Sequence, residues 1–141
     1  MSVYYDSNKT KAYAELHIWG EKIVPTEITD ILRISPTSSN VVGELWELGE
    51  KPYTVATWEF ITEEKPLKED VTEPLNDLIE VFKERTDDLN MIKQQNNDCT
   101  ITVHIVVHND QEVLPGFSIS IEQIRFLASI GTGIDYDIYN N

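Results

Sequence analysis

Two of the chain's three histidines, His104 and His108, stand in "HIVVH" with the i, i+4 spacing that helical zinc sites use. The stretch Thr100–His108 alternates apolar and polar side chains, which predicts a strand rather than a helix. On a strand the two side chains share a face but stand about 13 Å apart, at ~3.3 Å per residue. This separation excludes one shared metal ion. A cross-strand site that combines His17, His104 and an acid such as Glu15 stays open.

The C-terminal "GIDYDIYNN" places Asp135 and Asp137 two residues apart, where they share one side of an extended chain. Two such carboxylates can hold a metal ion or steer a proton, and they also suit the solvent-facing side of a strand. The other side carries Ile134, Tyr136 and Ile138, which predicts a closing strand with its apolar side in the core. We expect the aspartates to face water. The alternative is a site on an open sheet face formed by His17, His104, Asp135 and Asp137.

A third group of residues is acidic and recurs at intervals of three or four positions: Glu73, Asp77, Glu80, Glu84 and Asp87. On a helix these side chains form a stripe opposite the apolar one. Like charges at this spacing destabilise a helix by roughly 0.2–0.5 kcal/mol per pair. The stripe therefore predicts a protein-binding surface, with a solvated helix face as the alternative.

Familiar catalytic motifs are absent from the sequence: it has no G-x-S-x-G elbow, P-loop, H-E-x-x-H or C-x-x-C pair. "GTG" at 131–133 follows a predicted helix and precedes a strand, so we interpret it as a helix cap and turn rather than a phosphate loop. Cys99 is the single cysteine and cannot form an internal disulfide, which fits a reducing cytoplasm. We predict no catalytic residue, no cofactor and no metal.

The charge balance is strongly acidic, with 25 Asp and Glu against 11 Lys and Arg and a formal net charge of −14. Direct nucleic-acid binding depends on cationic side chains that neutralise phosphates, so this class of partner is disfavoured. A large field of one sign favours a partner of the opposite sign, which predicts a basic protein. The sequence shows no signal peptide and no apolar run of membrane-spanning length, so we expect a cytoplasmic protein with no membrane partner.

Periodicity along the chain predicts the elements that position these residues. In chain order we expect a strand Ala12–Gly20, a short helix from Pro25, hairpin arms Val41–Leu48 and Tyr53–Ile61, one long helix carrying Leu75 to Ile92, a strand Thr100–His108, a short strand Phe117–Ser120, a helix opened by a capping box of Ser120 and Gln123 and closed at Gly131, and the final strand.

This order predicts a single α+β domain over residues 1–141, with a flexible N-terminus at 1–11. The first six elements follow the β-α-β-β-α-β ferredoxin-like plan, and a C-terminal β-α-β unit follows them. The plan gives a mainly antiparallel sheet with helices on one face and the other face open. Its first and fourth strands are neighbours, which would bring Glu15, His17 and Trp19 beside Thr102, His104 and Val106.

Both ends of the chain resemble a known family. "AYAELHIWGEKIVPTEITDILRISPT", Gly43, Trp58 and "LPGFSISIEQIRFLASIGTGIDYDIYNN" are similar to the bacterial domain of unknown function family 4279. Arg33 departs from its pattern, in which a glycine usually precedes Ile34, and the middle third matches only in hydrophobic pattern. The resemblance implies a cytoplasmic, single-domain bacterial protein and supplies no activity.

Three functions follow as hypotheses. The first is a non-catalytic, acidic protein-binding domain, of the immunity or inhibitor type by analogy with small acidic proteins encoded beside toxins. The second is a small-molecule or metal-binding domain, or an enzyme, that uses the open sheet face. The third is a self-associating structural module that forms a homodimer.

Overall fold

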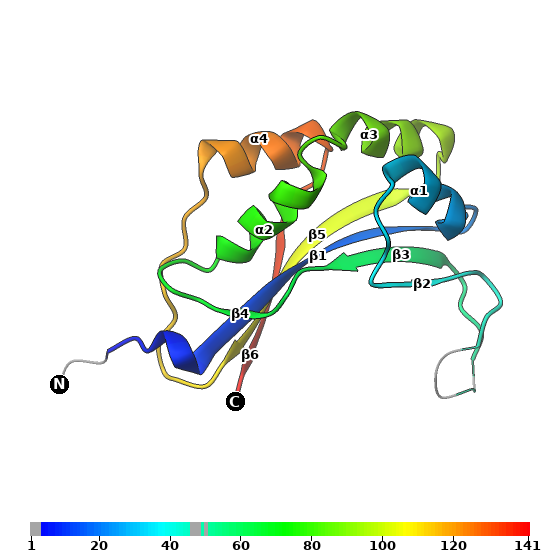
Figure 1. Cartoon of the computed structure of the whole chain (residues 1–141). Coiled ribbons are helices and arrows are strands. Elements are labelled where there is room, and N and C mark those ends of the chain that lie inside the picture. Colours follow the sequence, from blue (N-terminus) through cyan, green and yellow to red (C-terminus); the bar gives the residue numbers. More distant parts are fainter. Residues whose placement is uncertain (1–3, 46–48, 50) are drawn as a thin grey trace.

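The computed structural model describes residues 4–45, 49 and 51–141 (Figure 1). Within that part, the helices are the short 3-10 helix η1 (Ser7–Lys9), α1 (Pro25–Leu32), α2 (Glu73–Phe82), α3 (Thr86–Gln95) and α4 (Ile121–Ser129). The strands are β1 (Thr10–Gly20), β2 (Ser38–Asn40), β3 (Ala56–Ile61), β4 (Lys65–Pro66), β5 (Thr100–Asn109) and β6 (Asp135–Asn140). The predicted α+β class is confirmed.

One open sheet contains all of these strands, in the order β2-β3-β1-β5-β6, and the two-residue β4 pairs with the start of β1. Every pairing is antiparallel except that of β5 with β6. The predicted pairing of β1 with the strand at Thr100–His108 is confirmed. It places Glu15 opposite His104 and His17 opposite Thr102. The ferredoxin-like plan in its full detail stays a prediction, and β4 and the parallel β6 are additions to it.

All four α-helices lie on the same face of this sheet (Figure 1). Alternate residues of the two central strands point toward them and are buried: Ala12, Ala14, Leu16 and Ile18 of β1, and Ile101, Val103, Ile105 and Val107 of β5. Trp58 of β3 is fully buried among them, and its indole N–H donates to Thr29 Oγ1 of α1 at 3.0 Å. The core therefore fills the space between sheet and helices, and none of the described α-helices lies on the opposite sheet face.

The single long helix expected from Leu75 to Ile92 is wrong, because α2 ends at Phe82 and α3 begins at Thr86. Phe82, Leu89 and Ile92 are all fully buried, so the apolar spacing continues across the break. Asp87 and Asp88 lie in the first turn of α3, where negative charge stabilises the partial positive charge of a helix N-terminus. Periodicity alone cannot detect an interruption that preserves the buried positions.

Two predicted strands are also wrong. Val41–Leu45 forms no continuous strand: the predicted hairpin is reduced to an antiparallel bridge of Leu45 with Pro52 and backbone hydrogen bonds between Gly43, Glu44 and Tyr53, and residues 46–48 of that arm lie outside the described residues. The Asn40 amide donates to the carbonyl of Val55 at 2.8 Å, and Gly43 turns the chain with φ +92°. Phe117–Ser120 forms no strand either, and only a single bridge joins Gly116 to Asp70.

The expected ends of the last helix are confirmed. Ser120 Oγ accepts the Gln123 N–H at 3.1 Å, and Gln123 Oε1 accepts the Ser120 N–H at 2.9 Å, which completes the capping box. Gly131 follows α4 with φ +64°, a conformation that favours glycine. These local signals fix where the chain turns toward β6.

The N-terminal segment, predicted to be flexible over 1–11, packs on the domain from Tyr5 onward. The Tyr5 hydroxyl donates to the carbonyl of Leu67. Thr10 is buried and its hydroxyl donates to Asn109 Oδ1 at 2.6 Å. Residues 1–3 lie outside the described part.

Candidate functional site

The open sheet face collects the polar side chains of four neighbouring strands. Because successive strand residues point to opposite faces, burying Ala14, Leu16 and Ile18 turns the alternate residues of β1 outward. The strand register then sets their neighbours. The resulting face, called here the open face, carries Lys11, Tyr13, Glu15, His17 and Trp19 of β1, Thr57 and Glu59 of β3, Thr102, His104 and His108 of β5, and Asp135, Asp137 and Tyr139 of β6.

His17 lies at the centre of this face between two carboxylates. Its Nε2 is 2.6 Å from Glu15 Oε2, and its Nδ1 is 3.5 Å from Glu59 Oε1. Glu15 is two residues earlier on the same strand, whereas Glu59 belongs to β3 and lies directly opposite His17 in the pairing of β1 with β3. Ser38 Oγ of β2 donates to Glu59 Oε2 at 2.9 Å and helps to fix this second carboxylate.

These contacts change the titration of the pair. Burial lowers the pKa of His17, but the hydrogen bond to Glu15 and the charges of Glu59 and Glu15 outweigh it, so the pKa is raised. The hydrogen bond to His17 lowers the pKa of Glu15, and this effect exceeds the opposing effect of burial. The arrangement therefore favours an imidazolium next to a carboxylate over a wider pH range than isolated side chains would allow.

The second histidine of the predicted site joins the same cluster. The rings of His17 and His104 are 5.2 Å apart between centroids, and His104 Nδ1 lies 3.7 Å from Asp137 Oδ2. Asp135 pairs with His104 in register and is exposed, as is Asp137. The structure thus brings all four residues of the alternative prediction onto one face. The expectation that both aspartates face water agrees with their exposure.

His108, the other member of "HIVVH", has different neighbours. Its ring stacks on Tyr139 at 5.3 Å between centroids. His104 and His108 therefore contact different side chains on the open face. In the described residues, no group of three or more His, Cys, Asp or Glu side chains is arranged to hold a metal ion.

A hollow of about 390 Å³ borders the open face at its β2–β3 end. The chain after β2 descends from the sheet on the side opposite the helices, as Figure 1 shows. The hollow lies between this chain and the sheet, and Glu59 belongs both to its lining and to the His17 cluster. The full lining is Ser38, Ser39, Asn40, Glu44, Leu45, Tyr53, Thr57 and Glu59.

The acidic residues predicted as a protein-binding stripe do not form one continuous helix face, because the helix is interrupted. Glu73, Asp77 and Glu80 belong to α2, Glu84 lies in the turn, and Asp87 lies on α3.

Glu73 and Asp77 are occupied by contacts within the fold. The Glu73 carboxylate accepts the backbone N–H groups of Lys68, Glu69 and Asp70 at 2.8, 2.7 and 2.9 Å. Asp77 lies 3.4 Å from Lys65 Nζ. Glu80 pairs with Lys83 at 3.1 Å on the surface. Of the five predicted residues, Glu80, Glu84 and Asp87 are exposed.

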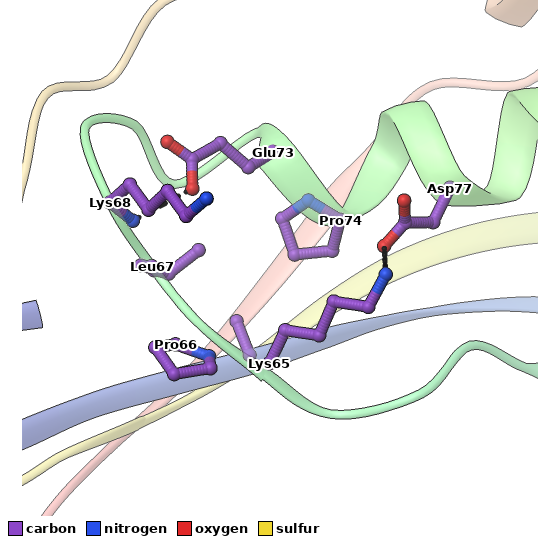
Figure 2. A pocket seen from close by; sticks show the side chains of 8 residues that line it. Lys65, Pro66, Leu67, Lys68, Glu73, Pro74 and Asp77 are labelled. Atoms are coloured by element: carbon purple, nitrogen blue, oxygen red, sulfur yellow. Dashed lines mark hydrogen bonds and ion pairs between the residues drawn. The ribbon is translucent and has the colours of Figure 1, made fainter. Parts of the chain in front are cut away.

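A second hollow, of about 300 Å³, lies beside the start of α2 (Figure 2). Figure 2 shows Lys65 reaching Asp77 across its rim, while the Glu73 carboxylate turns to the loop at Lys68. Its charged groups are used to hold α2 on the sheet, so we assign it a structural role. Ala12, Pro66, Leu67 and Pro74 complete the lining.

Sequence reasoning missed Glu59 as a partner of His17. The alternation of the predicted strand Tyr53–Ile61 places Glu59 opposite buried Trp58 and so on the polar side. The pattern cannot say which strand lies next to β1, and this neighbour decides the contact.

Residues 8–141 match the family described as Domain of unknown function (DUF4279), and the chain belongs to this family. No curated protein and no solved structure matches the chain. Among the described residues, no helix is long and apolar enough to cross a membrane.

Proposed function

We propose that this member of the DUF4279 family is a non-catalytic protein-binding domain, of the inhibitor or immunity type, whose open face receives a basic surface of a partner protein. The observation that carries the proposal is the charge of this face. Its described strand residues include four carboxylates, Glu15, Glu59, Asp135 and Asp137, against one lysine, Lys11, and the imidazolium of His17, which pairs with Glu15 and Glu59.

Rigid strands hold these carboxylates, so little conformational entropy is lost when a partner docks. Glu15 and Glu59 are fixed further by His17, and Glu59 also by Ser38. The net charge of −14 adds long-range attraction, which accelerates encounter with a basic partner. Position and charge together favour a cationic protein surface.

Aromatic side chains supply contact area around the acidic centre. Trp19 is 38% exposed at one end of the open face, and Tyr139 is 53% exposed on β6. Large rigid rings of this kind contribute much of the binding energy at protein interfaces. The single cysteine is compatible with a partner in a reducing, cytoplasmic compartment.

Two variants with the same change in net charge test the location of the binding surface. The open-face variant combines Glu15→Gln, Glu59→Gln, Asp135→Asn and Asp137→Asn. The control variant combines Glu80→Gln, Glu84→Gln, Asp87→Asn and Glu122→Gln, all exposed on the helix side.

Each protein is immobilised and exposed to lysate from its own cells, and retained proteins are quantified over a salt series. We expect basic proteins on the wild type and on the control, with retention that falls as salt rises. The open-face variant should lose them. Equal retention by all three folded proteins, or equal loss by both variants, contradicts the proposed surface.

A small-molecule site is the second candidate, favoured by the hollow of about 390 Å³ beside Glu59. Thr57→Trp would fill this hollow with a large ring while leaving the four open-face carboxylates unchanged. A compound that raises the melting temperature of the wild type and not of this variant would favour this candidate. Protein capture unaffected by Thr57→Trp would favour the first.

A further inference from the structure

The two edges of the sheet differ in how well they are protected. At one edge β2 has three residues and leads at once into an irregular segment. At the other edge β6 is six residues long, regular, and contains neither proline nor lysine. Proteins usually protect a free edge with prolines, charged side chains, bulges or very short strands, because its unpaired backbone groups otherwise recruit another strand. The two charged residues of β6, Asp135 and Asp137, point to the open face, so the backbone edge itself is available for pairing.

The direction of the free backbone groups follows from one hydrogen bond. The N–H of Asn141 donates to the carbonyl of Asn109 at 2.9 Å, so the backbone N–H and C=O of Asn141 are directed toward β5. Alternate residues of a strand repeat the direction. Asp135, Asp137 and Tyr139 therefore direct their backbone groups to β5, and Tyr136, Ile138 and Asn140 direct theirs to the free edge.

An exposed apolar group lies next to this edge. It consists of Phe117, Ile119, Ile121 and Ile124, which are 54%, 42%, 66% and 47% exposed, and is called here the edge patch. The Phe117 ring contacts the Tyr136 ring of β6 edge-on, at 5.5 Å between centroids.

The helical members of the edge patch face the same way. Glu122, Arg125 and Ser129 line the groove between α4 and α2. Ile124 lies on the side of α4 turned away from that groove, and Ile121, one turn before Arg125, lies on the outer side of the helix, away from the buried Phe126 and Leu127. Because α2 packs on β1, in the middle of the sheet, the side of α4 that carries Ile124 faces the β6 edge.

We propose that two copies of this chain pair through β6, antiparallel and related by a two-fold axis at Ile138, so that their edge patches cover each other. A two-fold axis perpendicular to the sheet extends both sheets into one and keeps both helical layers on the same side. Ile138 then pairs with its counterpart and Tyr136 pairs with Asn140, which joins only residues whose backbone groups point outward.

Charge selects this register and this partner. Pairing about Ile138 sets Asp137 opposite Tyr139 of the other copy, whereas a shift of the axis to residue 137 would oppose two aspartates. The charges nearest the patch on α4, Glu122 and Arg125, cancel, in a chain whose net charge is −14. The α4 part of the contact therefore adds no net repulsion, whereas Asp135 and Asp137 of β6 add repulsion that salt screens, and the open faces stay uncovered.

Sedimentation equilibrium of the full chain over a range of concentrations tests the association. We expect the mass to rise from that of the 16.2 kDa chain toward twice this value, and to rise more readily at high salt. Ile121→Glu and Phe117→Glu should weaken the dimer more than about tenfold, since each buries a charge in an apolar contact. The control Val24→Glu, at the 42% exposed N-cap position before α1, should leave it unchanged.

A monomer at every concentration, or a dimer that Ile121→Glu and Phe117→Glu leave intact, overturns the proposal. Because salt should strengthen this dimer and weaken docking of a basic partner, the two interactions fail independently of each other.

Cysteine crosslinking tests the register in chains that also carry Cys99→Ser. Asp137→Cys mixed with Tyr139→Cys should form a disulfide on oxidation, because directly opposed residues of a non-hydrogen-bonded pair lie about 4.5 Å apart between Cα atoms. Neither variant should crosslink alone. Crosslinking of Asp137→Cys with itself, or no crosslink in a mixture that is dimeric by sedimentation, refutes pairing about Ile138.

Discussion

The carboxylate of Glu73 connects the start of α2 to the loop before it. Its two oxygens accept three consecutive backbone N–H groups, with Oε1 bound to Lys68 and Oε2 shared by Glu69 and Asp70. This loop also forms the bridge between Asp70 and Gly116, so it ties α2 to the segment that leads into α4. The sequence suggested a binding role for Glu73, whereas its contacts predict a structural one.

The expected loss of stability follows from these three bonds. A hydrogen bond contributes about 0.5–1.5 kcal/mol net, and one to a charged group about 1.5–3 kcal/mol. The loop is largely exposed, so we use the lower range. Glu73→Gln retains one acceptor oxygen and should lower the free energy of unfolding by about 1–2 kcal/mol, while Glu73→Ala loses all three bonds and should lower it by about 2–3 kcal/mol.

Urea unfolding followed by tryptophan fluorescence measures these differences. Glu80→Gln is the matched control, because Glu80 lies about two turns further along α2 and makes only a surface pair with Lys83. It should change the free energy of unfolding by less than about 0.5 kcal/mol. If Glu73→Gln and Glu73→Ala are as stable as this control, the three bonds do not stabilise the loop and the reasoning is wrong.

Three further predictions concern single side chains. Arg33 closes α1 with φ 57° and ψ 34°, so Arg33→Gly should raise the free energy of unfolding by about 0.5–1 kcal/mol, and Arg33→Ala should not. The pKa of His17 is raised, so its contribution to stability is fully present below the usual value of 6.5 and is lost as the pH rises through the folded pKa. The pKa of Glu15 is lowered, so its contribution is present above 4.5 and is lost as the pH falls through the folded pKa. His17→Gln should therefore destabilise more at pH 6 than at pH 9 in urea titrations, and an equal loss at both would contradict the pairing. Burial, then the charge of Asp98, raises the pKa of the Cys99 thiol to about 11, although Lys93 opposes them. Its alkylation at neutral pH should be about a hundredfold slower in the folded than in the urea-unfolded chain, and equal rates would refute this.

Predictions from local pattern succeeded where the residues that determine a structural feature all lie within one short segment. The alternation in β1 and β5 reflects a strand with one buried face, and the capping box at Ser120 and Gln123 involves only residues three apart. Gly131 adopts the positive φ that its place after a helix requires. None of these features depends on a distant partner.

The failures involve partners from elsewhere in the chain. The acidic stripe assumed one helix, but the chain breaks after Phe82 while its apolar spacing continues. The pattern also misses β2, which lies before the predicted hairpin arm, because β2 is set by pairing with β3 and by the Asn40 contact with Val55.

The sequence by itself determined the charge, the α+β class and the set of side chains that face away from the core, since composition and period-two alternation are properties of the chain. It also placed Asp135 and Asp137 on the polar side of a final strand. Tertiary structure alone decided that β3 and β6 flank the predicted pair of β1 and β5, and with this the contact of His17 with Glu59 and of His104 with Asp137. It also decided that, in the part of the chain that the structure describes, all four α-helices lie on the other face and β6 ends the sheet (Figure 1). These outcomes depend on strand order, which is set by packing all four helices on one side, and no single segment encodes it.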